Sequence, residues 1–370
     1  MKRFKLLGQY LIYLVILAAP FYIFRYHLGS TPTTLLEVII YLSFAVNLIS
    51  GNLKIKNKKV IIAVGVFLIF ALIGALIDPS ISRGLGLWKA YFFDGVLVYL
   101  MVSSFAEDEK MPLFLSISGA LAAIATLVAA HFTADGRLLD LDRLSPNYLA
   151  LFLSPIFIIA LYQAVKNRFR VINIAGGILM LIAIVLSDSR GGYVAVIGGL
   201  IVIGLTYSLR KYSAKKVWLV GAILLLVLLG GTYAVFRPQN NDTGRIGSSS
   251  NIRYYIWQTS IEMIGRNPIW GVGLGAYQDS FKQLTDGRVN YNEYISPEAL
   301  TAHDLYLELY LTSGLFGLIS FLLMLYFALK KSKNYVIISA LAVILIYGLI
   351  DTPIFRNDLA VIFWTILALL

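Results

Sequence analysis

The chain consists mainly of apolar segments that are each about as long as a lipid bilayer is thick. A helix needs about 20 predominantly apolar residues to cross the hydrocarbon core. Twelve segments meet or approach this length: residues 6–24, 33–50, 60–77, 88–105, 112–131, 146–164, 171–187, 192–209, 217–235, 302–328, 335–350 and 359–370. Hydrophobic residues make up 59% of the sequence and charged residues 14%, unlike the composition of a soluble domain. We therefore predict an all-α polytopic membrane protein, with about 12 transmembrane helices in one integral membrane domain over residues 1–370.

The first and last segments need separate arguments. The opening MKRFK before an apolar run resembles a signal peptide, but no small-residue cleavage site follows and further spans come after it. We interpret residues 6–24 as a retained first helix. The last segment has only 12 residues, 359–370, so either the natural span is longer or the chain is truncated.

Basic residues divide alternate loops into two unequal sets. Short loops of the set that includes the N-terminus hold 18 lysines and arginines, against 7 in short loops of the other set. Positively charged short loops stay in the cytoplasm. We therefore predict a cytoplasmic N-terminus and an outward-facing long polar loop at residues 236–301. This distribution accounts for the formal charge of +11, and we expect no nucleic-acid partner.

The residues that commonly bind metals are sparse. The sequence has no cysteine, which excludes thiolate catalysis, disulfides and Cys-ligated metals. There is no His-x-x-x-His pair. Asp140 and Asp142 form an Asp-x-Asp pair that could hold a divalent cation beside a diphosphate, with a solvated loop as the alternative. We expect no metal and no other cofactor.

The long loop contains one clear helical pattern. The stretch SSSNIRYYIWQTSIEMIG begins with an N-cap signal and ends before Pro268. Arg253, Trp257, Ser260 and Ile264 share one face by their spacing, which predicts an amphipathic helix at the membrane surface.

Arg253 falls in the first turn of this helix, where free backbone N–H groups and the helix dipole favour an anion. Contact with lipid headgroups is the alternative interpretation. Arg245 and Arg266 compete for the same role. After Pro268, the glycine-punctuated turn 268–277 lacks the preceding strand of a dinucleotide site, so we expect a tight surface loop anchored by Trp270.

Arg190 lies in LSDSRGGY, where one apolar segment ends and the next begins almost at once. On the predicted topology this hairpin lies outside, where a charged side chain must pair, snorkel or face water. Gly191 and Gly192 would let a backbone or a ligand approach closely. The functional interpretation is contact with an anion. The alternative is a surface pair between Arg190 and Asp188.

His303 lies in PEALTAHDLYLELY. Thr301 followed by Asp304 resembles a capping box, which places His303 in the first helical turn at the water boundary. The helix dipole there disfavours imidazolium, whereas Asp304 and Glu308 favour it. A neutral imidazole is the form that a general base needs. The alternative is an interfacial histidine without a chemical role.

Taken in order, these residues resemble the O-antigen ligase / O-antigen polymerase superfamily, in particular its Wzy-C-type region. The resemblance covers residues 145–330. Its motifs are the SDSRGG hairpin, IRYYIWQTSIEMIGRNPIWGVGLGAY and AHDLYLELYLTSGLFGL. The family often has His-Asn where this chain has His303–Asp304, a mild departure that bears on how the imidazole is oriented.

The resemblance implies a GT-C-like membrane fold and a metal-independent, inverting glycosyl transfer. The donor would be an undecaprenyl-diphosphate-linked polysaccharide, and the acceptor a lipid A–core-like glycolipid or another glycan. Arg190 and Arg253 would bind the diphosphate, and His303 would take the proton of the acceptor hydroxyl. The protein would lie in the bacterial cytoplasmic membrane with its active site facing the periplasm, as an O-antigen ligase.

Three alternatives stay open. A polymerase that joins lipid-linked repeat units would use the same donor chemistry. A transporter or lipid-glycan flippase would depend on the intramembrane carboxylates Glu37 and Asp94, although no internal repeat is visible. A non-catalytic scaffold would need none of Arg190, Arg253 and His303.

Overall fold

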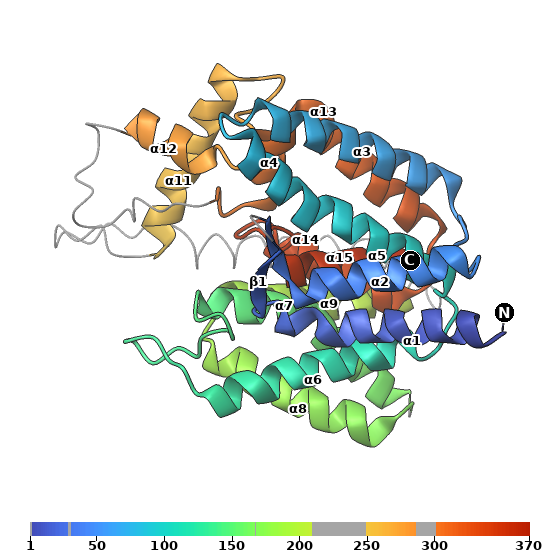
Figure 1. Ribbon diagram of the computed structural model, residues 1–370. Coiled ribbons are helices and arrows are strands. Elements are labelled where there is room, and N and C mark those ends of the chain that lie inside the picture. Colours follow the sequence, from blue (N-terminus) through green and yellow to red (C-terminus); the bar gives the residue numbers. More distant parts are fainter. Residues whose placement is uncertain (1, 29–30, 167, 209–248, 286–300) are drawn as a thin grey trace.

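The computed structural model describes residues 2–28, 31–166, 168–208, 249–285 and 301–370, and most of them are helical (Figure 1). Ten helices correspond to predicted segments: α1 (Lys2–Ala18), α2 (Leu35–Ile49), α3 (Lys58–Ile77), α6 (Met111–Ala129), α7 (Pro146–Val165), α8 (Arg170–Leu186), α9 (Arg190–Ser208), α13 (Leu305–Lys331), α14 (Tyr335–Tyr347) and α15 (Asn357–Ala368). An eleventh segment is formed by α4 (Ile81–Trp88), the π-helical turn η2 (Lys89–Phe93) and α5 (Asp94–Ser104).

Seven spans in the described ranges are long and apolar enough to cross a membrane, and four further apolar helices are shorter. The chain is thus a multi-pass, mainly α-helical membrane protein. The predicted ninth segment, residues 217–235, lies outside the described residues, so the count of twelve stays a prediction. The span predicted to start at residue 88 instead starts at Ile81, because α4, η2 and α5 form one continuous helix.

A short β-ribbon departs from the predicted all-α fold. Strands β1 (Arg25–Leu28) and β2 (Thr31–Thr34) pair antiparallel, after the 3-10 turn η1 (Ala19–Phe21) that ends the first span. Thr34 then caps α2: its hydroxyl accepts from the Glu37 backbone N–H, and the Glu37 carboxylate accepts from the Thr34 N–H. We call the end of the bundle that carries this ribbon the hairpin face.

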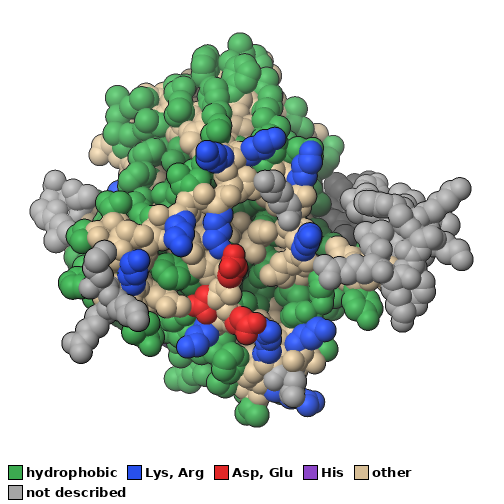
Figure 2. All heavy atoms as spheres, turned by 90° about the vertical axis from the view of Figure 1, so that its right-hand side faces the viewer, with side chains coloured by type: hydrophobic (Ala, Val, Ile, Leu, Met, Phe, Trp, Pro, Cys, Tyr) green, Lys and Arg blue, Asp and Glu red, His purple; other side chains and the backbone are tan. Residues whose placement is uncertain are grey.

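The opposite end of the bundle carries both labelled chain ends, and we call it the termini face (Figure 1). Basic side chains gather there around a small acidic group (Figure 2). Lys56 pairs with Glu107 and Arg168 with Glu109. The described basic loops that the sequence groups together therefore share one face. Which side of the membrane this face occupies stays a prediction.

Helix α15 lies in the middle of the bundle and is buried along its length (Figure 1). Trp364 fixes its position, because its indole N–H donates to the Tyr91 carbonyl at 3.3 Å and its ring meets Tyr99 edge-on. Gly95 makes room for this ring, since a Cβ at that position would lie 2.0 Å from the indole. The described helices therefore pack around α15.

The helix α13 is broken near the hairpin face. Gly314 has φ 73° and ψ 178°, so the helical hydrogen bonds stop there. A turn that follows α11 (Ser249–Arg266) and precedes α12 (Tyr277–Thr285) supplies the missing partners. The Ile269 carbonyl accepts from the Leu315 N–H at 2.9 Å, and the Val272 N–H donates to the Leu311 carbonyl at 2.8 Å.

Glycines allow this turn to lie against the helices. Gly271, Gly273 and Gly275 all have positive φ, and a Cβ on Gly271 would lie 2.3 Å from the Leu311 carbonyl oxygen. The predicted tight loop is therefore docked against α13 and α3, while Trp270 is 46% exposed.

Gly314→Ala is expected to destabilise the protein by roughly 1–3 kcal/mol, because the residue would hold a left-handed φ. Its Cβ would also lie 2.5 Å from the Ile269 carbonyl oxygen. Thermal unfolding of the purified protein in detergent measures the loss. Gly65→Ala in α3 is the matched control, since nothing lies within 4 Å of its Cβ position. Equal unfolding temperatures for the two variants would show that the break in α13 does not require a glycine at residue 314.

Candidate active site

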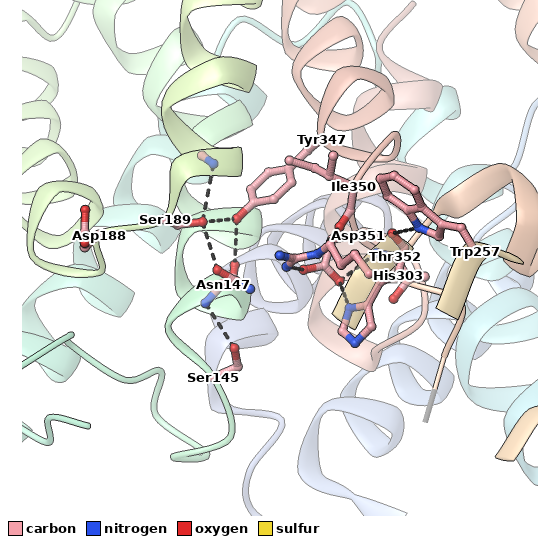
Figure 3. Close-up of polar contacts among 12 residues, drawn as sticks. Ser145, Asn147, Asp188, Ser189, Trp257, His303, Tyr347, Ile350, Asp351 and Thr352 are labelled. Atoms are coloured by element: carbon pink, nitrogen blue, oxygen red, sulfur yellow. Dashed lines mark hydrogen bonds and ion pairs between the residues drawn. The ribbon is translucent and has the colours of Figure 1, made fainter. Parts of the chain in front are cut away.

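The buried carboxylate of Asp351 joins His303 to Arg253 (Figure 3). One oxygen of Asp351 lies 3.4 Å from Nδ1 of His303, and the other lies 3.8 Å from the Arg253 guanidinium. Arg253 also donates from Nε to the Ile350 carbonyl at 3.1 Å. The carboxylate is 4% exposed and the imidazole 34%. Side chains from three separate segments therefore meet at the hairpin face, with the imidazole partly open to solvent.

Asp351 lies between α14 and α15, outside both helices. Its burial would raise the pKa of the carboxyl, but the hydrogen bond from His303 and the charges of His303 and Arg253 more than offset this effect. The pKa of Asp351 is therefore below its usual range. The carboxylate is an anion that orients two basic groups.

The position of His303 differs from the prediction. Helix α13 begins at Leu305, and Asp304 is its N-cap, accepting from the Tyr306 and Leu307 N–H groups at 2.8 Å. The capping-box prediction was wrong, because the short Asp304 side chain caps the helix itself. His303 therefore precedes the helix, with a left-handed φ of 47°.

The carboxylates expected to act on the imidazole are engaged elsewhere. Asp304 caps α13, and burial, partly offset by these backbone hydrogen bonds, raises its pKa. Glu308 accepts from the Ala302 N–H at 2.7 Å. The imidazole instead faces Asp351, which the sequence analysis did not select. The signal for Asp351 was the polar break LIDTPIFRND between the last two apolar segments, which falls on the predicted outer face.

Helix α11 holds the backbone of His303 as well as its carboxylate partner. Trp257 is one turn after Arg253, and its indole N–H donates to the His303 carbonyl at 3.2 Å. The next turn of the same face is buried, where Ser260 hydrogen-bonds the Tyr277 hydroxyl. The helix expected at the membrane surface thus packs this face against protein.

Arg190 lies on another helix. It is the first residue of α9, is exposed, and makes no hydrogen bond or ion pair with any residue that the structure describes. The alternative pair with Asp188 is not formed, because the Asp188 carboxylate accepts from the Tyr193 hydroxyl. The residue after it, Gly191, packs so closely that a Cβ would lie 2.5 Å from the Ile350 side chain. Arg190 therefore begins a helix that packs on the segment carrying Asp351.

The turn before Arg190 is fixed by hydrogen bonds (Figure 3). The Ser189 hydroxyl bonds the Tyr347 hydroxyl and the Asn147 side chain. Arg137 donates to the Ser187 carbonyl at 3.1 Å. Tyr347 and Arg137 are further residues that the sequence analysis missed, because their partners are distant in sequence.

Two of the secondary candidates lie outside this cluster. Arg266 pairs with Glu262 at the opposite end of α11, where the Arg266 side chain is 56% exposed. Arg245 falls in residues 209–248, which the structure does not describe.

The Asp140–Asp142 pair is not arranged as a cation site. Asp140 pairs with the buried Arg356, while Asp142 pairs with Arg25. Arg356 also pairs with Asp358, and its guanidinium lies over aromatic rings of its neighbours. Each carboxylate neutralises a different arginine, an arrangement that does not favour a shared cation.

The intramembrane carboxylates have local partners. Glu37 pairs with Lys89 at 3.0 Å, and Asp94 accepts from the Tyr41 hydroxyl at 2.7 Å. Both are buried. These contacts link α2 to the span Ile81–Ser104.

Residues 175–322 match the family described as O-antigen ligase. This match supports assigning the chain to the O-antigen ligase/polymerase family. It includes Arg190, Arg253 and His303 and ends before Asp351. A comparison with curated proteins found no match.

Replacing Arg356 by methionine is expected to cost about 3–5 kcal/mol of stability, because Asp140 and Asp358 would remain as uncompensated buried charges. Burial alone would lower the pKa of the Arg356 guanidinium. The neighbouring carboxylates have the larger effect and raise this pKa above its usual range. Arg266→Met removes an exposed pair and should cost only about 0.5 kcal/mol. Unfolding of both variants in detergent tests the contrast. A similar loss in both would show that the buried cluster contributes no more than a surface pair.

Proposed function

We propose that this O-antigen ligase-type membrane protein transfers an undecaprenyl-diphosphate-linked polysaccharide to an acceptor hydroxyl at the outer surface of the bacterial cytoplasmic membrane. The observation that carries the proposal is the convergence of His303 and Arg253 on the buried Asp351. A partly exposed imidazole beside a buried anion and an arginine suits proton transfer next to a phosphate leaving group.

His303 acts as the general base. When its Nδ1–H donates to Asp351, Nε2 carries the lone pair and faces the acceptor. The acceptor oxygen forms a bond to the anomeric carbon of the donor sugar, and the bond from that carbon to the diphosphate oxygen breaks. The proton of the acceptor hydroxyl moves to the imidazole, and undecaprenyl diphosphate leaves. Attack opposite the leaving group inverts the anomeric configuration.

Arg190 and Arg253 bind the diphosphate. A guanidinium forms paired hydrogen bonds to phosphate oxygens and keeps its charge at any working pH. Arg190 has no competing partner among the described residues, so it is available to the donor. Arg253 is 3.8 Å from Asp351, a long contact that a phosphate oxygen can replace. Two arginines supply the positive charge that a departing diphosphate requires, without a metal ion.

Transfer to a separate acceptor distinguishes the ligase from a polymerase. The purified protein in nanodiscs is given an undecaprenyl-diphosphate polysaccharide and a lipid A–core acceptor. We expect the polysaccharide to appear on lipid A–core. Elongation of the lipid-linked donor alone would identify a polymerase, which uses the same donor chemistry. Movement of the donor across a sealed bilayer without new glycosidic bonds would identify a flippase.

His303→Gln is expected to lower the transfer rate by about 10²–10⁴-fold, the usual contribution of a general base. Donor binding should persist in His303→Gln and weaken in Arg190→Ala, because Arg190 contacts the diphosphate in this mechanism and His303 does not. Arg266→Ala is the control. Single-turnover transfer and donor binding are measured separately. Near-normal transfer by His303→Gln would remove this histidine from the mechanism.

Asp351 is a positioning residue in this mechanism. Asp351→Asn keeps the side-chain shape but removes the anion, and kcat should fall by about 10–100-fold. Asp351→Glu restores the anion and should recover part of the lost rate. Equal rates for Asp351→Asn and Asp351→Glu would indicate that the negative charge is not what positions the imidazole.

A further inference from the structure

A groove with a mixed polar and apolar wall opens on the hairpin face, lined in part by the segments that carry His303 and Asp351. Two adjoining cavities of about 470 and 790 Å³ form it. They share lining residues from the β-ribbon, α4 and the start of α15: Arg25, Thr34, Arg83, Leu87 and Asn357. We call the two cavities together the groove. A volume of this size accommodates several sugar rings.

The groove lies next to the predicted base along the chain. Its wall includes Thr301, two residues before His303, and Arg356, five residues after Asp351. The Glu308 side chain in the first turn of α13 also lines it. A molecule held in the groove therefore lies along the two segments that carry the imidazole and its carboxylate partner.

The groove contains cations, but carboxylates neutralise them. Four basic side chains line it, and each has at least one acidic partner. The pairs are Arg25–Asp142, Arg83–Asp78, Arg83–Asp279, Lys89–Glu37, Arg356–Asp140 and Arg356–Asp358. Six carboxylates thus face four cations among the described residues. This balance does not favour a diphosphate, in contrast to Arg190.

Aromatic rings and hydrogen-bonding groups make up much of the remaining wall. The rings belong to Tyr22, Tyr91, Tyr148, Tyr277 and Phe355, of which Tyr91 and Tyr148 are partly exposed. The hydroxyls of Tyr91 and Tyr148 make no hydrogen bond to any residue that the structure describes, although both side chains are half-buried. Flat aromatic faces contact the C–H faces of sugar rings, while unsatisfied hydroxyls bind sugar hydroxyls.

We propose that the groove binds uncharged sugar rings of a glycan substrate. The same chemistry is offered by the polysaccharide of the donor and by the oligosaccharide of the acceptor. The assignment to a substrate rests on the proposed transferase function, whereas sugar binding itself rests on the groove. Tyr91 and Tyr148 are the residues most directly tested, because their hydroxyls are available to a ligand.

The test uses the double variant Tyr91→Phe/Tyr148→Phe, which keeps both rings and removes only the hydroxyls. Tyr99→Phe is the matched control, since Tyr99 lies further along α5, is 6% exposed, and donates no hydrogen bond to a described residue. Full-length protein in nanodiscs is titrated with three probes. These are O-polysaccharide freed of undecaprenyl diphosphate, core oligosaccharide freed of lipid A, and inorganic pyrophosphate.

We expect the double variant to bind one of the two sugars about 10-fold more weakly, as the loss of two hydrogen bonds implies. Pyrophosphate binding should be unchanged, and Tyr99→Phe should behave like the unaltered protein. The sugar that is affected identifies the source as donor or acceptor. Failure of the unaltered protein to bind either sugar, or equal binding by the double variant, would overturn the proposal.

The two proposals fail separately. If His303→Gln still transfers glycan while the tyrosine variant loses sugar binding, the proposed mechanism is wrong and sugar binding in the groove is supported. If pyrophosphate binding alone weakens in the tyrosine variant, the groove is an anion site and the sugar proposal is wrong.

Discussion

The candidate site depends on the backbone hydrogen bonds that bridge the break in α13. At Gly314 the helix α13 leaves its regular path, and backbone groups inside a low-dielectric bundle must find other partners. The turn after α11 provides them through the Leu315–Ile269 and Val272–Leu311 hydrogen bonds. These bonds fix the turn against α13. Because α11 leads directly into this turn, they also help to fix the helix that carries Arg253 and Trp257.

Asp351 brings the basic side chains of the site together. His303 and Arg253 lie 50 residues apart in sequence, yet each contacts a different oxygen of one carboxylate. Trp257 adds a bond to the His303 carbonyl, so the imidazole is restrained at its side chain and its backbone. A base held in this way loses little freedom when a substrate arrives.

Local patterns in the sequence predicted the local structure well. Apolar length identified ten helices of the bundle in the described ranges but missed α4 and α12. The pattern from the serine cluster to Gly265 anticipated α11 to within a residue. Composition and periodicity suffice for such features because each depends on neighbours within a few turns. The start of α13 was misplaced because Asp304 competes with Thr301 for the N-cap, and pattern alone does not decide between them.

The contacts that were missed join distant parts of the chain. Arg356 pairs with Asp140, 216 residues away, and Asp351 with His303, 48 residues away. A single sequence does not tell which of several outward-facing acids will neutralise which base. The Asp140–Asp142 motif illustrates this limit, since its spacing suits a cation while its carboxylates belong to two different arginines.

The central position of α15 has a consequence for biogenesis. Its Trp364 packs against Gly95 and bonds to Tyr91, 273 residues earlier in the chain. Helices that are inserted early therefore cannot complete their packing in the middle of the bundle until α15 has been inserted. Contacts of such long sequence separation slow folding, and partly assembled helices are exposed to quality-control proteases meanwhile. The middle of the bundle is therefore completed by a helix that is synthesised after the helices it packs against.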